Sequence, residues 1–205
     1  MFKSLTHLPA MFARFLRDRS AVAALEFAIV FPFLLFLFVA MTEMTTSLNY
    51  DRKVDQVSIT LADLIAREST LTAKQLEDLF SAAEQLMKPF DGNGMRIEVG
   101  VVKFVGTNLD PAVVWSVGKT LGEDTNLDQQ PWPVGQAPSG IDIPDELASS
   151  SSNLIVTKTK FDYRFLTGTL LHRLSSGDSF SAGKMELGGL YFTRSRQSNT
   201  VDFER

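Results

Sequence analysis

Residue types that carry enzyme chemistry are scarce in this sequence. The chain of 205 residues has no cysteine and two histidines, His7 and His172. Disulfides, thiolate catalysis and cysteine-based zinc sites are therefore excluded, and two histidines leave little basis for a histidine-built metal site. The acidic residues Asp142, Asp145 and Glu146 lack the spacing of an EF-hand loop, so we interpret them as a solvated acidic loop. The sequence predicts no catalytic residue, metal site, cofactor or small-molecule substrate.

Two further patterns that can bind ligands have simpler explanations. Residues 91–94 read DGNG, which lacks the longer spacing and the lysine of a phosphate-binding loop, so they predict a turn. Residues 154–165 interleave basic and aromatic side chains, as single-stranded nucleic acid can require. Strand alternation explains the same pattern, and a net charge of −4 gives no basic footprint for nucleic acid. We therefore expect no nucleic-acid partner.

The carboxylate of Glu26 is the most unusual polar group, because it lies in an apolar run. Residues 21–41 read AVAALEFAIVFPFLLFLFVAM, and Glu26 is their only charged residue. A helix rises about 1.5 Å per residue, so this run can cross a hydrocarbon core of roughly 30 Å, and membrane helices tolerate a proline such as Pro32. A carboxylate there must reach the headgroup layer or find a partner. The residues alone leave both explanations open.

The charges that flank the apolar run predict its orientation. Residues 1–20 carry one acid, Asp18, against four basic residues: Lys3, Arg14, Arg17 and Arg19. Positive residues beside a membrane helix tend to stay in the cytoplasm. A secretory signal peptide has a shorter apolar core followed by an Ala-x-Ala cleavage site, and no such site follows the apolar core of this run before Thr42. We expect a cytoplasmic leader (residues 1–21), a retained transmembrane helix (22–41) and an extracytoplasmic domain (42–205).

The segment SAVAALEFAIVFP, following basic residues, resembles the processing region of type IV pilin-like proteins. It is most similar to the TadE/TadG-like minor pseudopilins of tight-adherence (Tad, or Flp-type) pili, and the resemblance is sharpest over residues 14–67. It implies that a prepilin peptidase cuts between Ala21 and Val22, which makes Glu26 the fifth mature residue and Phe27 its neighbour. The family usually has glycine before the cut, where this chain has Ala21, and TadG-like relatives are often left uncut. Processed and unprocessed chains both remain open.

The resemblance also implies a function. The chain would be a non-enzymatic minor pilin-like subunit or assembly factor in the bacterial inner membrane, with its C-terminal domain in the periplasm or in an extracellular pilus. Its partners would be the prepilin peptidase, other pilin and pseudopilin subunits and the Tad secretion machinery. Glu26 would pair with the N-terminal amine of a neighbouring subunit, beside the membrane-anchor residues Ala28, Ile29, Val30, Phe31, Pro32, Phe33, Leu34, Leu35, Phe36, Leu37, Phe38 and Val39.

A function of another class remains open beside it. The chain could be a single-pass, unprocessed extracytoplasmic binding or adhesion module. The feature that favours it is the long irregular loop over residues 118–152, which contains four prolines, because ligand contacts often lie on loops.

The remaining elements follow from periodicity. Apolar positions between residues 42 and 67 recur at spacings of three and four, which predicts that the membrane helix continues outward as a stalk. Thr72 and Gln75 fit a capping box before a second helix over residues 73–87. Strands are predicted over residues 95–105, 112–117, 154–165 and 188–193, with Trp115 as a packing residue, followed by a polar tail over 194–205. The expected class is α+β: the long helix plus a second helix packed on an antiparallel sheet of about four strands, pilin-like by resemblance.

Overall fold

The computed structural model describes residues 19–123, 127–149, 151–165, 168 and 184–204. His7, His172 and the leader up to Asp18 lie outside these residues. The chain divides into two compact units, residues 1–45 and 46–205, which we describe separately. We call residues 46–205 the head domain.

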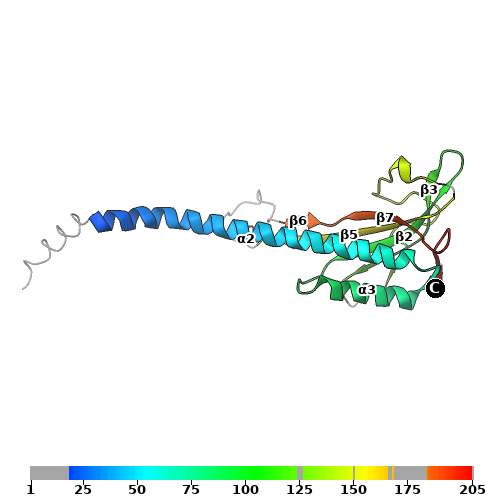
Figure 1. Cartoon of the computed structure of the whole chain (residues 1–205), viewed down its shortest axis with the longest axis horizontal. Helices are drawn as coiled ribbons and strands as arrows, with labels where there is room; N and C mark the ends of the chain where they lie inside the picture. The colour runs from blue at the N-terminus through cyan, green and yellow to red at the C-terminus, as the bar shows by residue number, and fades with distance from the viewer. Residues whose placement is uncertain (1–18, 124–126, 150, 166–167, 169–183, 205) are drawn as a thin grey trace, which may run out of the picture. The chain divides into compact units, whose positions relative to one another are not determined.

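One long helix, α2 (Arg19–Ala66), confirms the prediction of an uninterrupted helix through the apolar run and beyond it (Figure 1). Pro32 lies inside it. In the head domain, α2 buries one stripe of side chains at helical spacing: Val54, Val57, Leu61 and Ile65. This stripe is the one that the apolar periodicity predicts.

The second helix, α3 (Ala73–Met87), has the predicted bounds because its first turn is capped as expected. The Thr72 hydroxyl accepts a hydrogen bond from the Gln75 backbone N–H at 3.3 Å, and the Gln75 side chain accepts one from the Thr72 N–H at 2.8 Å. These bonds satisfy two amides that a helix start leaves free. The helix buries the apolar stripe Leu76, Phe80, Ala83 and Met87.

The sheet of the head domain is antiparallel throughout, and its order is β4-β3-β2-β5-β6 with β7 also paired to β5. Its strands are β2 (Arg96–Val105), β3 (Asp110–Thr120), β4 (Asp128–Gln129), β5 (Leu154–Arg164), β6 (Lys184–Leu187) and β7 (Leu190–Arg194). Strands β6 and β7 follow one another along the same edge of β5, so the sheet is about five strands wide. The α+β class is confirmed, and the prediction of about four strands is too low.

A break at two glycines separates β6 from β7. The strand predicted over residues 188–193 covers these glycines and most of β7, and β6 was not predicted. At Gly188, φ is +146°, and a Cβ would lie 2.1 Å from the Thr159 carbonyl oxygen. Only glycine allows the backbone to approach β5 so closely. The edge therefore bends between two short strands.

The two faces of the sheet are covered by different parts of the chain. Helix α3 and the head-domain part of α2 cover one face, with Ile97, Val99 and Val117 in the core beneath them. On the opposite face, Trp132 packs with Val102, Val113, Leu154 and Val156 in a smaller cluster, which Ile141, Ile143 and Leu147 border. The irregular segment after β3 therefore supplies a second core, and it begins after Thr120, because β3 continues that far. It includes the short 3-10 helix η1 (Asp145–Leu147).

A small parallel sheet joins β1 (Thr70–Thr72) to β8 (Asp202–Glu204). Val201, just before β8, is fully buried, and its carbonyl accepts a hydrogen bond from the Trp115 indole N–H at 2.6 Å. The prediction of a polar tail over residues 194–205 is therefore wrong for residues 201–204. Trp115 is a packing residue, as predicted, and its N–H also holds this segment.

Candidate membrane-spanning segment and processing site

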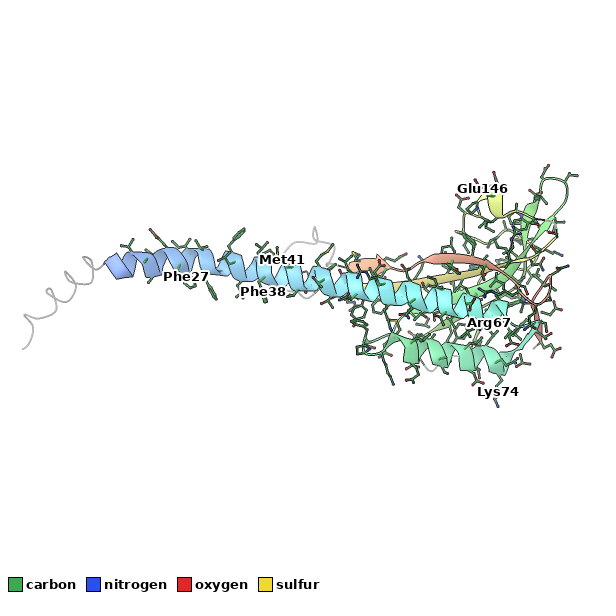
Figure 2. The ribbon with its side chains drawn as sticks, in the orientation of Figure 1. Phe27, Phe38, Met41, Arg67, Lys74 and Glu146 are labelled. Atoms are coloured by element: carbon green, nitrogen blue, oxygen red, sulfur yellow. The ribbon has the colours of Figure 1, made fainter. Side chains whose placement is uncertain are left out.

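The first part of α2 presents apolar side chains on all sides. Val22, Phe27, Ile29, Phe33 and Phe38 are 54–71% exposed. Figure 2 shows Phe27, Phe38 and Met41 projecting from this part of the ribbon. The most apolar stretch has a mean hydropathy of 2.6, and none of it is buried. A helix that is apolar on every side requires an apolar environment.

By length and composition, α2 can cross a membrane. A signal sequence near an N-terminus has the same two properties, so they define a candidate membrane segment and not its topology. Beyond the apolar run, the hydroxyls of Thr42 and Thr45 donate to the Val39 and Met41 carbonyls at 2.8 and 2.9 Å. Hydrogen bonds of this kind, to carbonyls in the preceding turn, satisfy the threonine hydroxyls within the helix itself.

The predicted processing and assembly residues all lie within the first three turns of the described helix. Ala21 and Val22 are consecutive helical residues, and Val22 and Glu26 lie four residues apart, on one face of the helix. Glu26 is exposed, and no hydrogen bond or ion pair joins it to another side chain within the described residues. The ring of Phe27 lies 5.4 Å from that of Phe31, one turn further on. The predicted anchor residues 28–39 are helical and lie in the exposed apolar stretch.

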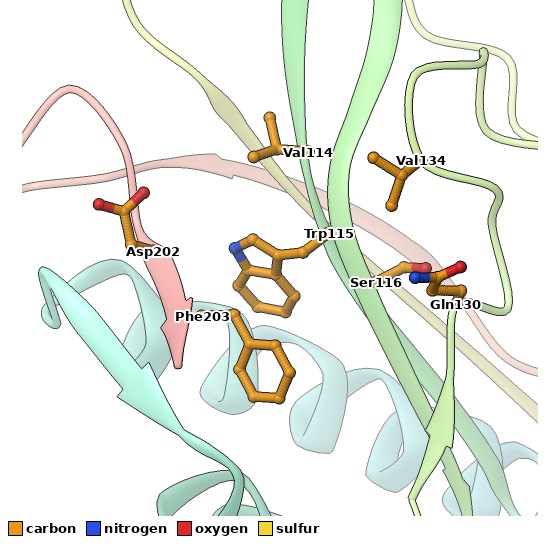
Figure 3. A pocket seen from close by; sticks show the side chains of 7 residues that line it. All are labelled: Val114, Trp115, Ser116, Gln130, Val134, Asp202 and Phe203. Carbon is orange, nitrogen blue, oxygen red and sulfur yellow. The ribbon is translucent and has the colours of Figure 1, made fainter. Parts of the chain in front are cut away.

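Shallow pockets lie among the described residues of the head domain. One, of about 350 Å³, lies among Val114, Trp115, Ser116, Gln130, Val134, Asp202 and Phe203 (Figure 3). The Ser116 hydroxyl donates to the Trp132 carbonyl at 2.9 Å and accepts from the Trp132 N–H at 3.0 Å. The indole N–H of Trp115 is bonded to the Val201 carbonyl. Both of these polar groups of the lining therefore make hydrogen bonds within the fold. A serine without an adjacent base is not an activated nucleophile.

A second pocket, of about 440 Å³, lies beside an aromatic cluster. The Tyr50 ring of α2 stacks on Phe161 at 5.5 Å and contacts Phe90 at 4.6 Å and Tyr163 at 5.1 Å. These rings join α2 to β5 and to the segment after α3. Among the described residues, no group of three or more His, Cys, Asp or Glu side chains converges to hold a metal ion.

One titrating group on α2 has a shifted pKa. Partial burial, followed by repulsion from Asp51 one turn earlier, raises the pKa of the Asp55 carboxyl. The carboxylate approaches the break between β6 and β7, because a Cβ on Gly189 would lie 2.6 Å from an Asp55 oxygen. Close by, the Ser58 and Thr159 hydroxyls share a buried hydrogen bond of 2.7 Å. Periodicity indicates that this part of α2 packs against the head but not that it packs through polar groups.

Comparison with protein-family models, with curated proteins and with solved structures finds no match for this chain.

Proposed function

We propose that this protein is a non-enzymatic, pilin-like subunit or assembly factor of a Tad-type pilus, anchored in the bacterial inner membrane by α2. In this proposal, the N-terminus is cytoplasmic and the head domain is periplasmic or incorporated in the pilus. A prepilin peptidase removes the leader between Ala21 and Val22. The mature protein then assembles through its N-terminal helix.

The observation that carries the proposal is the contrast between the exposed first part of α2 and the buried stripe on its second part. Residues 22–38 are exposed and, apart from Glu26, apolar, whereas Val54, Val57, Leu61 and Ile65 on the same helix are fully buried in the head-domain core. One helix therefore provides both an apolar segment of spanning length and a structural element of the folded domain. If a signal peptidase removed the apolar run at its end, α2 would begin near residue 42 and would keep only the part that belongs to the head domain.

The spacing of Glu26 from the cut supports the assembly role. Cleavage would create an amine at Val22, one helical turn from the Glu26 carboxylate. Each charge is costly in an apolar layer, and a neighbouring copy can supply the opposite charge to both. Glu26 has no partner among the described residues of its own chain that would compete for this role.

The first experiment is the intact mass of the full chain extracted from membranes of cells with and without a prepilin peptidase. We expect loss of residues 1–21 only when the peptidase is present. An Ala21→Gly variant restores the residue usual in the family and should be cut at least as completely. A chain that stays uncut in both the natural and the Ala21→Gly forms would refute processing and favour the unprocessed binding or adhesion module. Loss of a longer segment without the peptidase would identify a signal peptide instead.

A second experiment tests the orientation. The chain has no cysteine, so single cysteines report position without background. Ser139 is exposed on the head domain, and Ser4 lies in the leader. In spheroplasts of cells without the prepilin peptidase, where the leader stays on the chain, a membrane-impermeant maleimide should label Ser139→Cys directly and Ser4→Cys only after lysis. The reverse pattern would place the head domain in the cytoplasm and refute the proposed topology.

A further inference from the structure

The segment after β4 bonds to the edge of β3 at two points and leaves the strand between them. The Gln130 N–H donates to the Ser116 carbonyl at 3.0 Å, and the Gly135 N–H donates to the Val113 carbonyl at 2.8 Å. At Gln130, φ is +71°, a left-handed conformation that few residues other than glycine adopt. Residues 131–134 follow this turn. Between the two bonds, this edge of β3 has no strand partner among the described residues.

The uncovered stretch of β3 contains a bulge. Val101 pairs with Trp115 and Val102 pairs with Val113, so Val114 is an extra residue without a partner on β2. A bulge interrupts the ladder and redirects the side chains beside it. The pocket of about 350 Å³ lies over this stretch. It is therefore built by two local departures from regular strand pairing.

The two sides of this pocket differ in chemistry (Figure 3). The rings of Trp115 and Phe203, whose centroids are 5.5 Å apart, lie on one side together with the carboxylate of Asp202. The side chains of Gln130 and Val134 lie on the other side. Trp115 is 7% exposed and Val134 is 50% exposed. The pocket thus has a buried aromatic floor and an open rim.

The polar groups of the lining differ in whether the fold uses them. The Ser116 hydroxyl and the Trp115 indole N–H make the hydrogen bonds described above. Within the described part of the chain, neither the Asp202 carboxylate nor the Gln130 side-chain amide forms an ion pair or hydrogen bond. Asp202 is the only charged residue of the lining, and an ionised carboxylate only accepts hydrogen bonds. The group that best complements this pocket is therefore a cationic donor.

The backbone that carries Asp202 is held on both sides of the residue. The Asp202 N–H donates to the Ser69 carbonyl at 3.0 Å, and the preceding carbonyl, of Val201, accepts from the Trp115 indole. Asp202 also pairs with Thr70 in the small parallel sheet. Because this backbone is already ordered, a ligand at the carboxylate pays little for ordering it.

We propose that this pocket binds an arginine side chain of a partner protein. The guanidinium pairs with Asp202 and its stem lies on the rings of Trp115 and Phe203, since a planar guanidinium suits both carboxylates and aromatic faces, whereas a lysine ammonium is a compact point charge. The backbone of the arginine stays outside the open rim, where the Gln130 amide can donate to and accept from a peptide group. A small-molecule site would instead bury most of its ligand. This contact is independent of leader processing.

The first test uses N-acetylarginine amide as the probe and the ¹⁵N-labelled full chain in detergent micelles. The chain has two tryptophans, so its indole N–H signals are easily resolved by NMR. We expect the Trp115 signal to shift saturably, with a dissociation constant on the order of 1–10 mM for a ligand of this size. The Trp132 indole, which is 1% exposed in the cluster on the opposite face, is the reference.

Matched probes separate charge from shape. N-acetylcitrulline amide has nearly the same shape without the charge, and it should bind at least about fivefold more weakly, because a charge-assisted hydrogen bond is lost. Equal binding of the two probes, or no saturable shift with either, would overturn the proposal. Free arginine distinguishes the source of the guanidinium. If it bound at least tenfold more tightly than the capped probe, the pocket would be a small-molecule site, and a partner protein would be refuted.

A pair of variants on β8 assigns the charge to one residue. Asp202→Asn should weaken binding of N-acetylarginine amide at least about fivefold, because the carboxylate is lost. The control is Glu204→Gln, since Glu204 is also an exposed acid, two residues later on the same strand, and does not line the pocket. It should leave binding unchanged. Equal affinities in the two variants, at unchanged melting temperatures, would refute the role of Asp202 and with it the proposal.

Discussion

The close approach of Trp132 to Gly100 makes a sharp stability prediction. A Cβ at Gly100 would lie 2.8 and 2.9 Å from two ring carbons of Trp132 and 2.7 Å from the Trp115 carbonyl oxygen. Gly118, on the neighbouring strand β3, would place its Cβ no closer than 3.4 Å to the Ile97 carbonyl oxygen, which is ordinary contact. Gly100→Ala and Gly118→Ala therefore form a matched pair with the same chemical change and different clearances.

The expected cost of Gly100→Ala follows from two limits. If the core absorbs the added methyl group, overpacking costs about 1–3 kcal/mol. If the indole of Trp132 leaves its site instead, about 150–250 Å² of aromatic surface returns to water, which costs about 4–6 kcal/mol at 25 cal/mol per Å². We expect a loss of about 2–5 kcal/mol, or about 4–20 °C in melting temperature for a domain of this size. Gly118→Ala should change stability by less than about 1 kcal/mol.

Intrinsic fluorescence is a suitable assay, because the chain has two tryptophans, Trp115 and Trp132, and both lie in the head domain. Urea unfolding of the full chain in detergent then reports the head and not the apolar part of α2. In Gly100→Ala, we also expect a red-shifted emission and faster quenching by acrylamide. Losses of stability that agree within 0.5 kcal/mol in the two variants would show that Trp132 does not lie against Gly100, and the reasoning would fail.

Two further predictions concern other contacts. Trp115→Phe keeps an aromatic ring beside Phe203 but leaves the buried Val201 carbonyl without its hydrogen bond, so we expect a loss of about 1–3 kcal/mol in urea unfolding and faster tryptic cleavage after Arg196; unchanged stability and cleavage would contradict the role of the indole N–H. Because the folded-state pKa of Asp55 is raised above its ordinary value of 3.8, its contribution to stability is present below that pH and is lost as pH rises through the folded pKa. Asp55→Asn should therefore raise the melting temperature slightly at pH 7 and leave it unchanged at pH 3, whereas a lower melting temperature at pH 7 would contradict the sign.

Local sequence signals predicted the helices well. The reciprocal bonds of Thr72 and Gln75 set the start of α3 where the capping pattern indicates, since both residues belong to one turn. The stripe from Val54 to Ile65 appears in α2 because helical periodicity needs no knowledge of distant residues. Glu26 and Ala21 are also local signals, and they remain hypotheses about processing and assembly.

Features that depend on distant pairing were missed. Strand β4 has two residues and β8 has three, which is too short for a period of two to be recognised. Val201 is buried because β8 pairs with β1, far away in sequence. The placement of Lys160 opposite Arg96 has the same origin, because it exists only in the observed register, and a slip of one residue would turn each side chain to the other face.

The pairing of β1 with β8 has a consequence for the order of events during synthesis. Thr70 pairs with Asp202, 132 residues later in the chain, so this sheet and the buried Val201 cannot form until almost the whole head has been made. The apolar residues of α2 leave the ribosome far earlier. In a cell, the helix would therefore have time to enter a membrane before the head closes, and an unfinished head would expose its core. A nascent chain stopped before residue 201 should accordingly be a preferred substrate for chaperones and proteases.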